Sequence, residues 1–532
     1  MSFASFAAPF APELVLLAGT LLIFLLDVLK VRRIEVVGGV AVAATVVALG
    51  LVAADLGFAP LAFLATIPAS SIDRLPAAGA APLFTFTSLG LIFQAIFLLA
   101  AFLVALASVS RPSDERGAPI FFGLLLVATL GMLLVAIASD LIFVLLAIEV
   151  VSIASYLLVA YTRKDVRGLE AAMKFFVIGA LSTVLSFFGA SLLFGAYGTT
   201  NLYLIRDAGT AVAYPVLALL GYGFLIAGLA FKVTLVPFHA WAVDVYDGAP
   251  DDASAFLAGG TKKIGVFAFF LVFLGPVLVA GTVGQSGYGL FGGSVALGPS
   301  FQITLGVLAV LTMTVGNVLA LLQKEMKRML AYSSISQAGY MLIGIAIGTA
   351  PAIGGATLQV LAHVLMKTGA FLVVGAVAAL GVGPLIDDWR GLGLKRPFLA
   401  TSFALMLLSL AGVPLTVGFV SKFVLFSAAV QAQGWFIWLA VAGLLNSALS
   451  VFYYARVLKV IFFDAAPDSA SAPAGAVVGG AGPPALAVGG LGYGRAATLA
   501  IIAALIVALG IYPQVVLGAI QTAAYHFVSV GA

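Results

Sequence analysis

The sequence contains no cysteine, and only 9% of its 532 residues are charged. Without cysteine the chain can form no disulfide, no thiolate nucleophile and no cysteine-held zinc site or iron–sulfur cluster. A soluble domain usually carries about 25% charged residues, so this chain has too few to cover a surface that faces water. With 63% hydrophobic residues, the composition instead predicts an all-α polytopic membrane protein that lies in a lipid bilayer.

Histidine is also scarce, and His239, His363 and His526 lie too far apart in the sequence to indicate a haem or metal site. The net charge of +4 is small and gives no indication of nucleic-acid binding. The first residues lack the basic stretch that begins a cleaved signal peptide, so the first apolar segment is predicted to be a retained span.

Long apolar runs are what the sequence has in abundance. A spanning helix needs roughly 20 mostly apolar residues, and this criterion predicts about 14 transmembrane helices. The predicted ranges are 12–29, 35–54, 85–109, 119–138, 141–161, 169–195, 213–236, 253–280, 302–322, 329–349, 355–381, 398–426, 436–463 and 497–518. Residues 465–494 are rich in Ala, Gly, Pro and Ser, which predicts a flexible linker before the last span.

Basic residues are distributed unevenly between the two sides of these spans. Of the 25 lysine and arginine residues, seventeen fall in or beside the odd-numbered loops, and only Arg74 and Arg206 fall in the even-numbered ones. Cytoplasmic loops carry the excess of positive charge. We therefore expect the odd-numbered loops to be cytoplasmic and both termini to lie on the non-cytoplasmic side of a bacterial or archaeal inner membrane.

Charged residues also occur inside the spans, where each costs roughly 2.5–3.5 kcal/mol to insert. Glu149 is central in the fifth span, and the six basic residues within spans are all lysines: Lys174, Lys232, Lys262, Lys263, Lys367 and Lys422. Arginine stays protonated in proteins, whereas a desolvated lysine can release its proton. Lysines in this setting are therefore candidate proton-transfer groups.

Structural roles stay open for two of these lysines. Lys174 is one helical turn from Glu170 and could form a local ion pair or extend its ammonium group to the membrane interface. Lys367 is one turn from His363, and the two could form a structural pair within the protein.

Two spans are interrupted close to a lysine. Pro237 follows Lys232 by five residues, and Pro414 precedes Lys422 in the twelfth span. Proline breaks a helix, and backbone freed at membrane depth is tolerated only inside protein or beside a water-filled cavity. We therefore expect both lysines to lie where water can reach. A purely structural ion pair inside lipid would add little stability, which favours functional roles for Lys232, Lys422 and Glu149.

Two five-span units carry similar motifs in the same order. "AAMKFFVIGA" around Lys174 resembles "HVLMKTGAFLVVGA" around Lys367, and Val-Pro occurs in the next span of each unit. Because five is an odd number, the second unit would be inverted relative to the first. The predicted organisation is a three-helix N-terminal segment (1–110), two inverted five-helix repeats (119–280 and 302–463), the linker (465–494) and a C-terminal transmembrane helix (497–518).

These residues predict a proton or cation translocator with a row of protonatable groups near the bilayer midplane. Lys232, Lys262, Lys367 and Lys422 are expected to form the row, with neighbours on the order of 6–12 Å apart so that one or two waters can bridge them. Lys263 follows Lys262 directly and would point about 100° away from it on a helix, so we expect Lys263 to face away from the row.

Several longer motifs resemble the antiporter-like subunits of respiratory complex I. They are "FKVTLVPFHAWAVDVYDGAP" (231–250), "FLAGGTKKIGVF" (256–267), "KRMLAYSSISQAGYMLIGI" (327–345) and "LSLAGVPLTVGFVSKF" (408–423). Within that family, "DVYDGAP" is similar to subunit N rather than to subunits M or L. The resemblance covers nearly the whole chain, and the sequence departs from the family pattern at Val243, Leu415 and Val417.

The residues and the resemblance together imply a site and a setting. The implied proton-transfer residues are Glu149, Lys232, Lys262, Lys422, Lys367 and Lys174, with Pro237 and Pro414 at helix breaks and His239 and His363 as accessory groups. The resemblance implies proton pumping by a membrane subunit of NADH:quinone oxidoreductase, beside other antiporter-like and small helical subunits. NADH, FMN, iron–sulfur clusters and quinone would then bind to partner subunits, with no cofactor or metal in this chain.

Two other functions stay open. One is a subunit of a multisubunit sodium/proton antiporter, which shares the fold, and the other is a non-translocating membrane scaffold whose lysines are inert. The subunits that co-purify with the chain would distinguish the first, and substitutions that leave pumping unchanged in an intact complex would favour the second.

Overall fold

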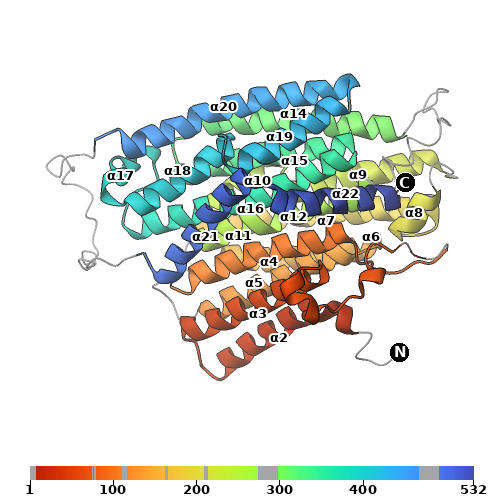
Figure 1. Cartoon of the computed structure of the whole chain (residues 1–532), viewed down its shortest axis with the longest axis horizontal. Helices are drawn as coiled ribbons and strands as arrows, with labels where there is room; N and C mark the ends of the chain where they lie inside the picture. The colour runs from red at the N-terminus through yellow and green to blue at the C-terminus, as the bar shows by residue number, and fades with distance from the viewer. Residues whose placement is uncertain are drawn as a thin grey trace.

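The computed structural model describes residues 7–74, 76, 79–110, 117–161, 166–208, 212, 214–273, 297–465 and 491–531. Helices make up almost all of the described residues, and most lie side by side with their axes roughly aligned (Figure 1). The N-terminal helices lie at one edge of this bundle, and α14 and α20 lie at the opposite edge. The predicted all-α polytopic fold class is confirmed.

Thirteen helical segments of the described chain are long and apolar enough to cross a membrane. The first eight are Ala8–Val28, which contains α2 (Ala11–Val28), α3 (Ile34–Asp55), α4 (Ser88–Ser108), α5 (Ala118–Ile137), α6 (Leu141–Ala160), α7 (Val166–Tyr197), α9 (Pro215–Val233) and Asp251–Phe273. The other five are α14 (Leu297–Leu321), α15 (Met326–Ile347), α16 (Ala350–Ala379), α20 (Ile437–Phe462) and α21 (Tyr493–Ile511). Two shorter apolar helices, α18 (Pro397–Ala411) and α19 (Val417–Gln431), occupy the remaining predicted range.

Side chains at helix starts set the boundaries of two of these spans. Asp140 accepts hydrogen bonds from the backbone amides of Ile142 (2.9 Å) and Phe143 (3.3 Å), and so it caps α6. Thr87 accepts one from the amide of Gly90 at 3.0 Å, and so it caps α4. Such caps satisfy amides that have no partner inside the helix. The helix that carries the fifth-span glutamate therefore begins where the sequence predicts.

The seventh span is interrupted around Pro237. The helix α9 ends at Val233. Pro237 has no N–H, so it cannot donate a hydrogen bond to the carbonyl of Val233. Thr234 then adopts a left-handed backbone conformation (φ 66°), and the helix α10 (Ala240–Gly248) follows.

The twelfth span is interrupted around Pro414. The helix α18 ends before Gly412 (φ 91°), and Leu415 also has a positive φ of 70° before α19 begins. The two breaks differ in one respect: Lys232 lies in the last turn before its break, whereas Lys422 lies inside α19, after its break.

A third break was not predicted. The sequence predicts one C-terminal helix over 497–518, but α21 ends at Ile511, and a further helix, α22 (Gln514–Gly531), begins directly after Pro513. Pro513 has no N–H to continue α21 and disfavours helical backbone at the residue before it. Of the predicted linker, residues 466–490 lie outside the described residues.

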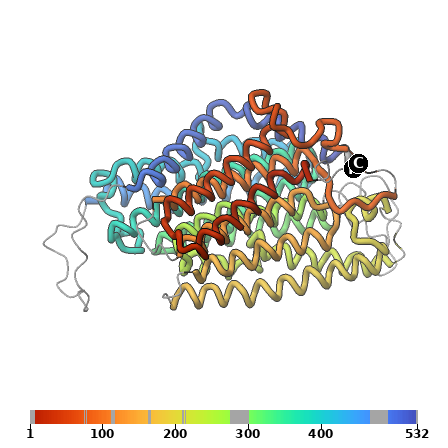
Figure 2. The backbone as a smooth tube through the Cα atoms, turned by 90° about the horizontal axis from the view of Figure 1, so that it is seen from below, coloured from red at the N-terminus to blue at the C-terminus, as the bar shows by residue number. Residues whose placement is uncertain are grey.

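The C-terminal helices lie close to the N-terminal ones, because α21 and α22 both pack on α4 (Figure 2). The third break also lies beside the second: a side-chain carbon at Gly510 would come within 2.3 Å of the Leu415 carbonyl oxygen. Residues far apart in sequence therefore meet at the level where α18 and α19 are separated.

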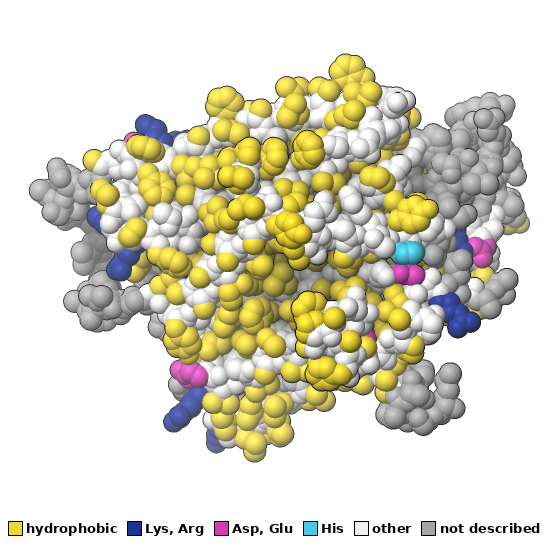
Figure 3. Space-filling model, viewed as in Figure 1, with side chains coloured by type: hydrophobic (Ala, Val, Ile, Leu, Met, Phe, Trp, Pro, Cys, Tyr) yellow, Lys and Arg dark blue, Asp and Glu magenta, His cyan; other side chains and the backbone are white. Residues whose placement is uncertain are grey.

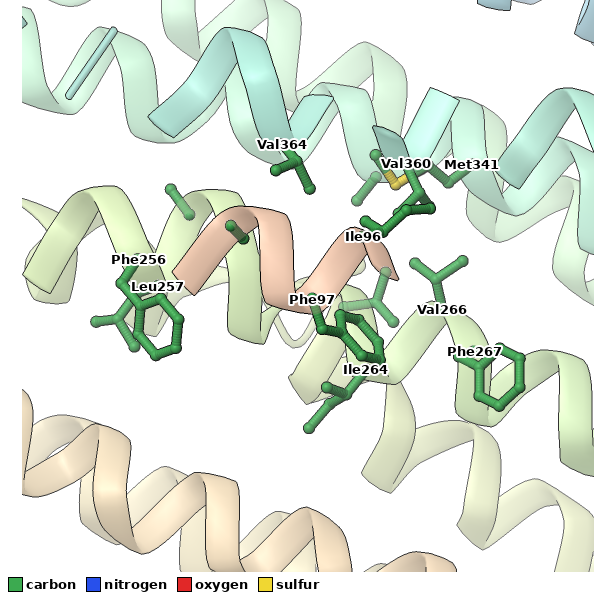
Figure 4. Packing of buried hydrophobic residues seen from close by; sticks show 14 of the residues in the cluster. Ile96, Phe97, Phe256, Leu257, Ile264, Val266, Phe267, Met341, Val360 and Val364 are labelled. Atoms are coloured by element: carbon green, nitrogen blue, oxygen red, sulfur yellow. The ribbon is translucent and has the colours of Figure 1, made fainter. Parts of the chain in front are cut away.

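The centre of the bundle is formed by α15, α16 and the segment Asp251–Phe273, which are almost entirely buried. Figure 4 shows Phe97 of α4, Ile264 of that segment and Val360 of α16 within one cluster of buried apolar side chains. The face seen in Figure 3 presents a broad hydrophobic band, with charged side chains gathered mainly at the two ends of the helices. This distribution suits a lipid bilayer around the middle of the bundle.

Candidate proton-transfer row

Lys232 lies directly before the first break and reaches towards α6. Its Nζ donates a hydrogen bond to Ser152 Oγ and lies 5.2 Å from the ring centre of Phe231 and 5.9 Å from that of Tyr156. The ring faces and the hydroxyl partly replace water around the ammonium group. Within the described structure Lys232 forms no ion pair.

Glu149 lies half-buried on α6 and faces α7. Its Oε1 accepts a hydrogen bond from Thr183 Oγ1 at 2.6 Å. A small cavity, whose lining includes Glu149, Ser182, Thr183 and Lys232, separates the carboxylate from the ammonium group. Glu149 and Lys232 therefore border the same small cavity, and no ion pair joins them in the described structure.

A second cavity begins on the other side of Lys232. Its lining includes Ser152 and Ser155 of α6, Trp241 of α10, and Lys262. Lys232 borders both cavities, so it is the one described side chain that links the fifth-span carboxylate to the lysine of the eighth span.

Lys262 lines this second cavity and also contacts α15. Its Nζ donates to the backbone carbonyl of Ser334 at 2.8 Å and lies 3.3 Å from Ser334 Oγ. The same hydroxyl lies 3.5 Å from Nε2 of His363 on α16. Ser334 therefore joins the lysine of the eighth span to the histidine of the eleventh.

Lys367 is held by the neighbouring serine of α15. Its Nζ donates to the carbonyl of Leu330 at 2.8 Å and to Ser333 Oγ. Lys367 and His363 are fully buried and lie one turn apart on the same face of α16. Lys367 and His363, which the sequence predicts as a structural pair, are therefore neighbours on α16, and each contacts its own serine: Lys367 contacts Ser333 and His363 contacts Ser334.

Lys422 is held at the second break. Its Nζ donates to the carbonyl oxygens of Leu410 (2.8 Å) and Ala411 (3.2 Å) and to Ser447 Oγ (3.0 Å), and it lies 4.9 Å from the ring centre of Tyr340. The last carbonyls of α18 have no backbone amide partner because the helix stops there. A helix C-terminus also favours a positive charge. The break thus creates the oxygen cage that the lysine fills.

The family of this chain follows from comparison with known proteins. Residues 138–450 match the protein family described as NADH:quinone oxidoreductase/Mrp antiporter, TM. The chain belongs to this family. The matched region contains every residue of the row described above.

Individual members of this family are similar over most of their length. The chain is 39% identical over 468 residues to F(420)H(2) dehydrogenase subunit N of Methanosarcina mazei, covering 85% of this chain and 88% of that protein. It is 42% identical over 377 residues to NADH-quinone oxidoreductase subunit N of Trichlorobacter lovleyi, covering 70% and 73% respectively. These relatives support the resemblance to subunit N that the sequence motifs indicate.

Solved structures of related complexes share the fold. A chain of respiratory complex I from Thermus thermophilus, a structure with bound aureothin, matches with a TM-score of 0.71 and 29% identity, covering 95% of this chain and 98% of that one. A chain of the Mrp complex from Dietzia sp. DQ12-45-1b matches with a TM-score of 0.79 and 22% identity, covering 100% of both. The second match shows a shared fold only.

Lys263 differs from its prediction. It is fully buried, donates to the carbonyl of Ala258 at 2.8 Å, and lies close enough to Lys367 and His363 to interact electrostatically. The expectation that it faces away from the row is therefore wrong. A π-helical turn over Leu257–Thr261 directly precedes the two lysines, and Lys263 donates back to a carbonyl of this turn.

Lys174 takes the structural alternative. Its side chain is 45% exposed and pairs with Glu170 at 2.9 Å and Asp244 at 3.2 Å, and Arg328 also pairs with Asp244 at 3.3 Å. This ion-pair cluster ties α7 and α15 to α10, and it gives Lys174 no contact with the row. His239 lies at the start of α10, and its buried Nδ1 has no hydrogen-bond partner in the described structure.

Sequence reasoning missed the hydroxyl groups of the site. Ser152, Thr183, Ser333, Ser334 and Ser447 each contact a charged row residue. The available signal was small hydroxyl residues inside apolar spans, above all the adjacent serines of "YSSIS". Such residues also bond to their own helix backbone, so the sequence alone does not identify those that bind lysine.

Replacing Glu149 with glutamine is expected to slow coupled turnover of the assembled complex. The amide keeps the size of the side chain and a hydrogen bond to Thr183, but it removes the negative charge that faces Lys232 across the first cavity. The measurement is proton movement per electron in membrane vesicles, with Glu170→Gln as the control, because Glu170 is an exposed acid on α7. Unchanged proton transfer in a fully assembled Glu149→Gln complex would contradict the expected role.

Proposed function

We propose that this chain is a proton-translocating membrane subunit of a redox-driven NADH:quinone oxidoreductase. In this proposal protons move along the row formed by Glu149, Lys232, Lys262, Lys367 and Lys422. The observation that carries the proposal is the series arrangement of the four lysines, of which Lys232 is half-buried and the other three are buried. Each donates to carbonyl or hydroxyl oxygens rather than to a carboxylate.

The nature of these partners is what suits a relay. A lysine paired with a carboxylate is held in its charged form, whereas one that is held by neutral oxygens in a desolvated site can give up its proton more readily. Two cavities meet at Lys232, and hydroxyl groups of Ser152 and Ser334 lie at the next contacts. Water and hydroxyl groups can pass protons between groups that lie within hydrogen-bond reach of them.

The setting of the proposal is a larger membrane complex. Relatives that carry this fold are subunits of NADH-quinone oxidoreductase and of F(420)H(2) dehydrogenase. We place NADH, FMN, iron–sulfur clusters and quinone in partner subunits, and this chain beside other antiporter-like subunits in a bacterial or archaeal inner membrane. Both termini would lie on the non-cytoplasmic side, and residues 119–280 and 302–463 would form the two inverted repeats.

The proposal is tested by Lys262→Met in the assembled complex. Methionine keeps the length of the side chain but cannot carry a proton, so fewer protons should cross sealed vesicles for each electron delivered to quinone. Lys395→Met is the control, because Lys395 lies in a short helix, α17 (Leu392–Lys395), outside the bundle core. An unchanged proton-to-electron ratio in an intact Lys262→Met complex would favour the scaffold function.

The antiporter alternative has its own readout. A sodium/proton antiporter would exchange sodium for protons without any electron donor, and it would co-purify with small cation-antiporter subunits. Purification of this chain with quinone-reducing subunits, and proton movement that requires an electron donor, are the results expected here.

A further inference from the structure

A pair of buried glutamines lies beside Lys422. Gln337 of α15 and Gln359 of α16 are fully buried, and Nε2 of Gln359 donates to Oε1 of Gln337 at 2.7 Å. Burying two primary amides inside a membrane bundle is costly unless their hydrogen bonds are satisfied. Here both amides are hydrogen-bonded to each other and to the surroundings of Lys422.

Both ends of this chain of hydrogen bonds lead to Lys422. At one end Nε2 of Gln337 donates to the carbonyl of Leu410 at 3.3 Å, and the same carbonyl accepts from Lys422 at 2.8 Å. At the other end Ser421, the residue before Lys422, donates through Oγ to Oε1 of Gln359 at 2.5 Å. The chain therefore links the acceptor of the lysine, through α15 and α16, back to the helix that carries the lysine.

The direction of the chain is set by Leu410. A backbone carbonyl can only accept hydrogen bonds, so the amide of Gln337 must present its NH₂ group there and its oxygen to Gln359. Gln359 must then present NH₂ to Gln337 and its oxygen to the hydroxyl of Ser421. Turning either amide alone would bring two acceptors or two donors face to face.

The same two side chains lie on the helix faces that carry the rest of the row. On α16, Gln359 is one turn before His363, which is one turn before Lys367, so the three share a stripe. On α15, Gln337 is one turn after the serines that hold Lys262 and Lys367. The glutamine pair therefore contacts the surroundings of Lys422 on one side and continues the polar stripes of the central group on the other.

We propose that Gln337 and Gln359 are positioning residues that hold Lys422 in place at the second break, by fixing its acceptor at Leu410 and the neighbouring Ser421. This inference rests on the proposed function. An amide side chain does not gain or lose a proton near neutral pH, so it cannot hand a proton along as a lysine can. Its orientation, however, depends on the acceptor at Leu410, which Lys422 shares.

The Leu410 carbonyl oxygen has two lone pairs, so it accepts from Gln337 and from Lys422 at the same time. At the other end of the chain, Gln359 accepts from Ser421. The two amides therefore fix both the acceptor of Lys422 and the turn of α19 that carries it.

The test is Gln359→Glu, which changes one NH₂ group to an oxygen at nearly constant size. At low pH the new carboxyl is protonated, and its O–H can donate to Gln337 while its carbonyl accepts from Ser421. At high pH it is ionised, cannot donate, and opposes the oxygen of Gln337. The proton-to-electron ratio of the assembled complex is therefore expected to be close to wild type at low pH and at least halved at high pH.

Several groups face the substituted position, and the pH profile must be compared with theirs. They are Lys422 on α19, Tyr340 and Gln337 on α15, and His363 on α16 itself, while α18 presents a backbone carbonyl. All are present in the wild type, so its pH profile corrects for their titration. The matched control is Gln302→Glu, the same chemical change in α14 outside the chain, which should give the wild-type profile.

The outcomes separate this inference from the proposed function. Lys422→Met is measured in the same vesicles: if it leaves the ratio unchanged, the proposed function fails. If Lys422→Met lowers the ratio but Gln359→Glu matches the wild type at every pH, the positioning role of the glutamines is overturned. If Gln359→Glu does not assemble, Ser421→Ala removes the end of the chain with little change in size, and an unchanged ratio there overturns the inference.

Discussion

Lys232→Met is expected to lower proton transfer through this chain by about 10²-fold or more, the order of effect for removing a positioned proton-transfer group. Lys232 borders both cavities of the first half, so its loss separates Glu149 from Lys262 in one step. Methionine fills nearly the same volume and leaves Ser152 with its bond to its own helix. The effect should therefore appear in proton movement per electron and not in assembly.

The matched control for Lys232→Met is Lys174→Met. It makes the same chemical change at an exposed ion pair with Glu170 and Asp244. Exposed pairs contribute roughly 0.2–1 kcal/mol, so this variant should assemble and pump nearly as the wild type does. Equal losses in the two variants would mean that Lys232 has no special place in the path.

Gly418→Ala is expected to cause the largest loss of stability. An added side-chain carbon would lie 1.9 Å from the backbone carbonyl oxygen of Ser409, and a backbone atom cannot turn aside as a side chain can. Overpacking of this kind costs about 1–3 kcal/mol and more where the backbone must move. The measured result should be a lower melting temperature of the purified complex.

The loss at Gly418 should also reach the lysine of the second break. The backbone N–H of Gly418 donates a hydrogen bond to Ser409 Oγ at 3.1 Å, and this bond holds the start of α19 against α18. Gly223→Ala is the control, because an added carbon there meets nothing within 4 Å and lies inside a helix as well. If both variants melt at the wild-type temperature, the close approach of α18 and α19 is not important for stability.

Sequence reasoning succeeded for the features that depend only on the residues along the chain. In a bilayer a span must be long, apolar and helical, so the ranges of the spans could be read from hydropathy alone. The cost of a charge in lipid made Lys232, Lys262, Lys367 and Lys422 stand out, and proline made the two interrupted spans visible. The family motifs around these residues pointed to subunit N, and the comparisons agree.

Sequence reasoning failed where helix phase or a distant partner decides. Lys263 donates to the carbonyl of Ala258 in the π-helical turn before it, and nothing in the local sequence marks that turn. Lys174 has the same residue type and hydropathy setting as the row lysines. Only the position of Asp244, seventy residues away, shows that it belongs to a surface cluster.

The sequence by itself determined the membrane fold, the lysines of the row and the places where two spans break, because lipid penalises charge and unpaired backbone at every position alike. Only the tertiary structure decided which oxygen atoms hold each lysine, that Pro513 makes a third break, and that two glutamines link the acceptor of Lys422 to Ser421. The reason is that each hydrogen bond in the row joins helices that meet only after the chain has packed.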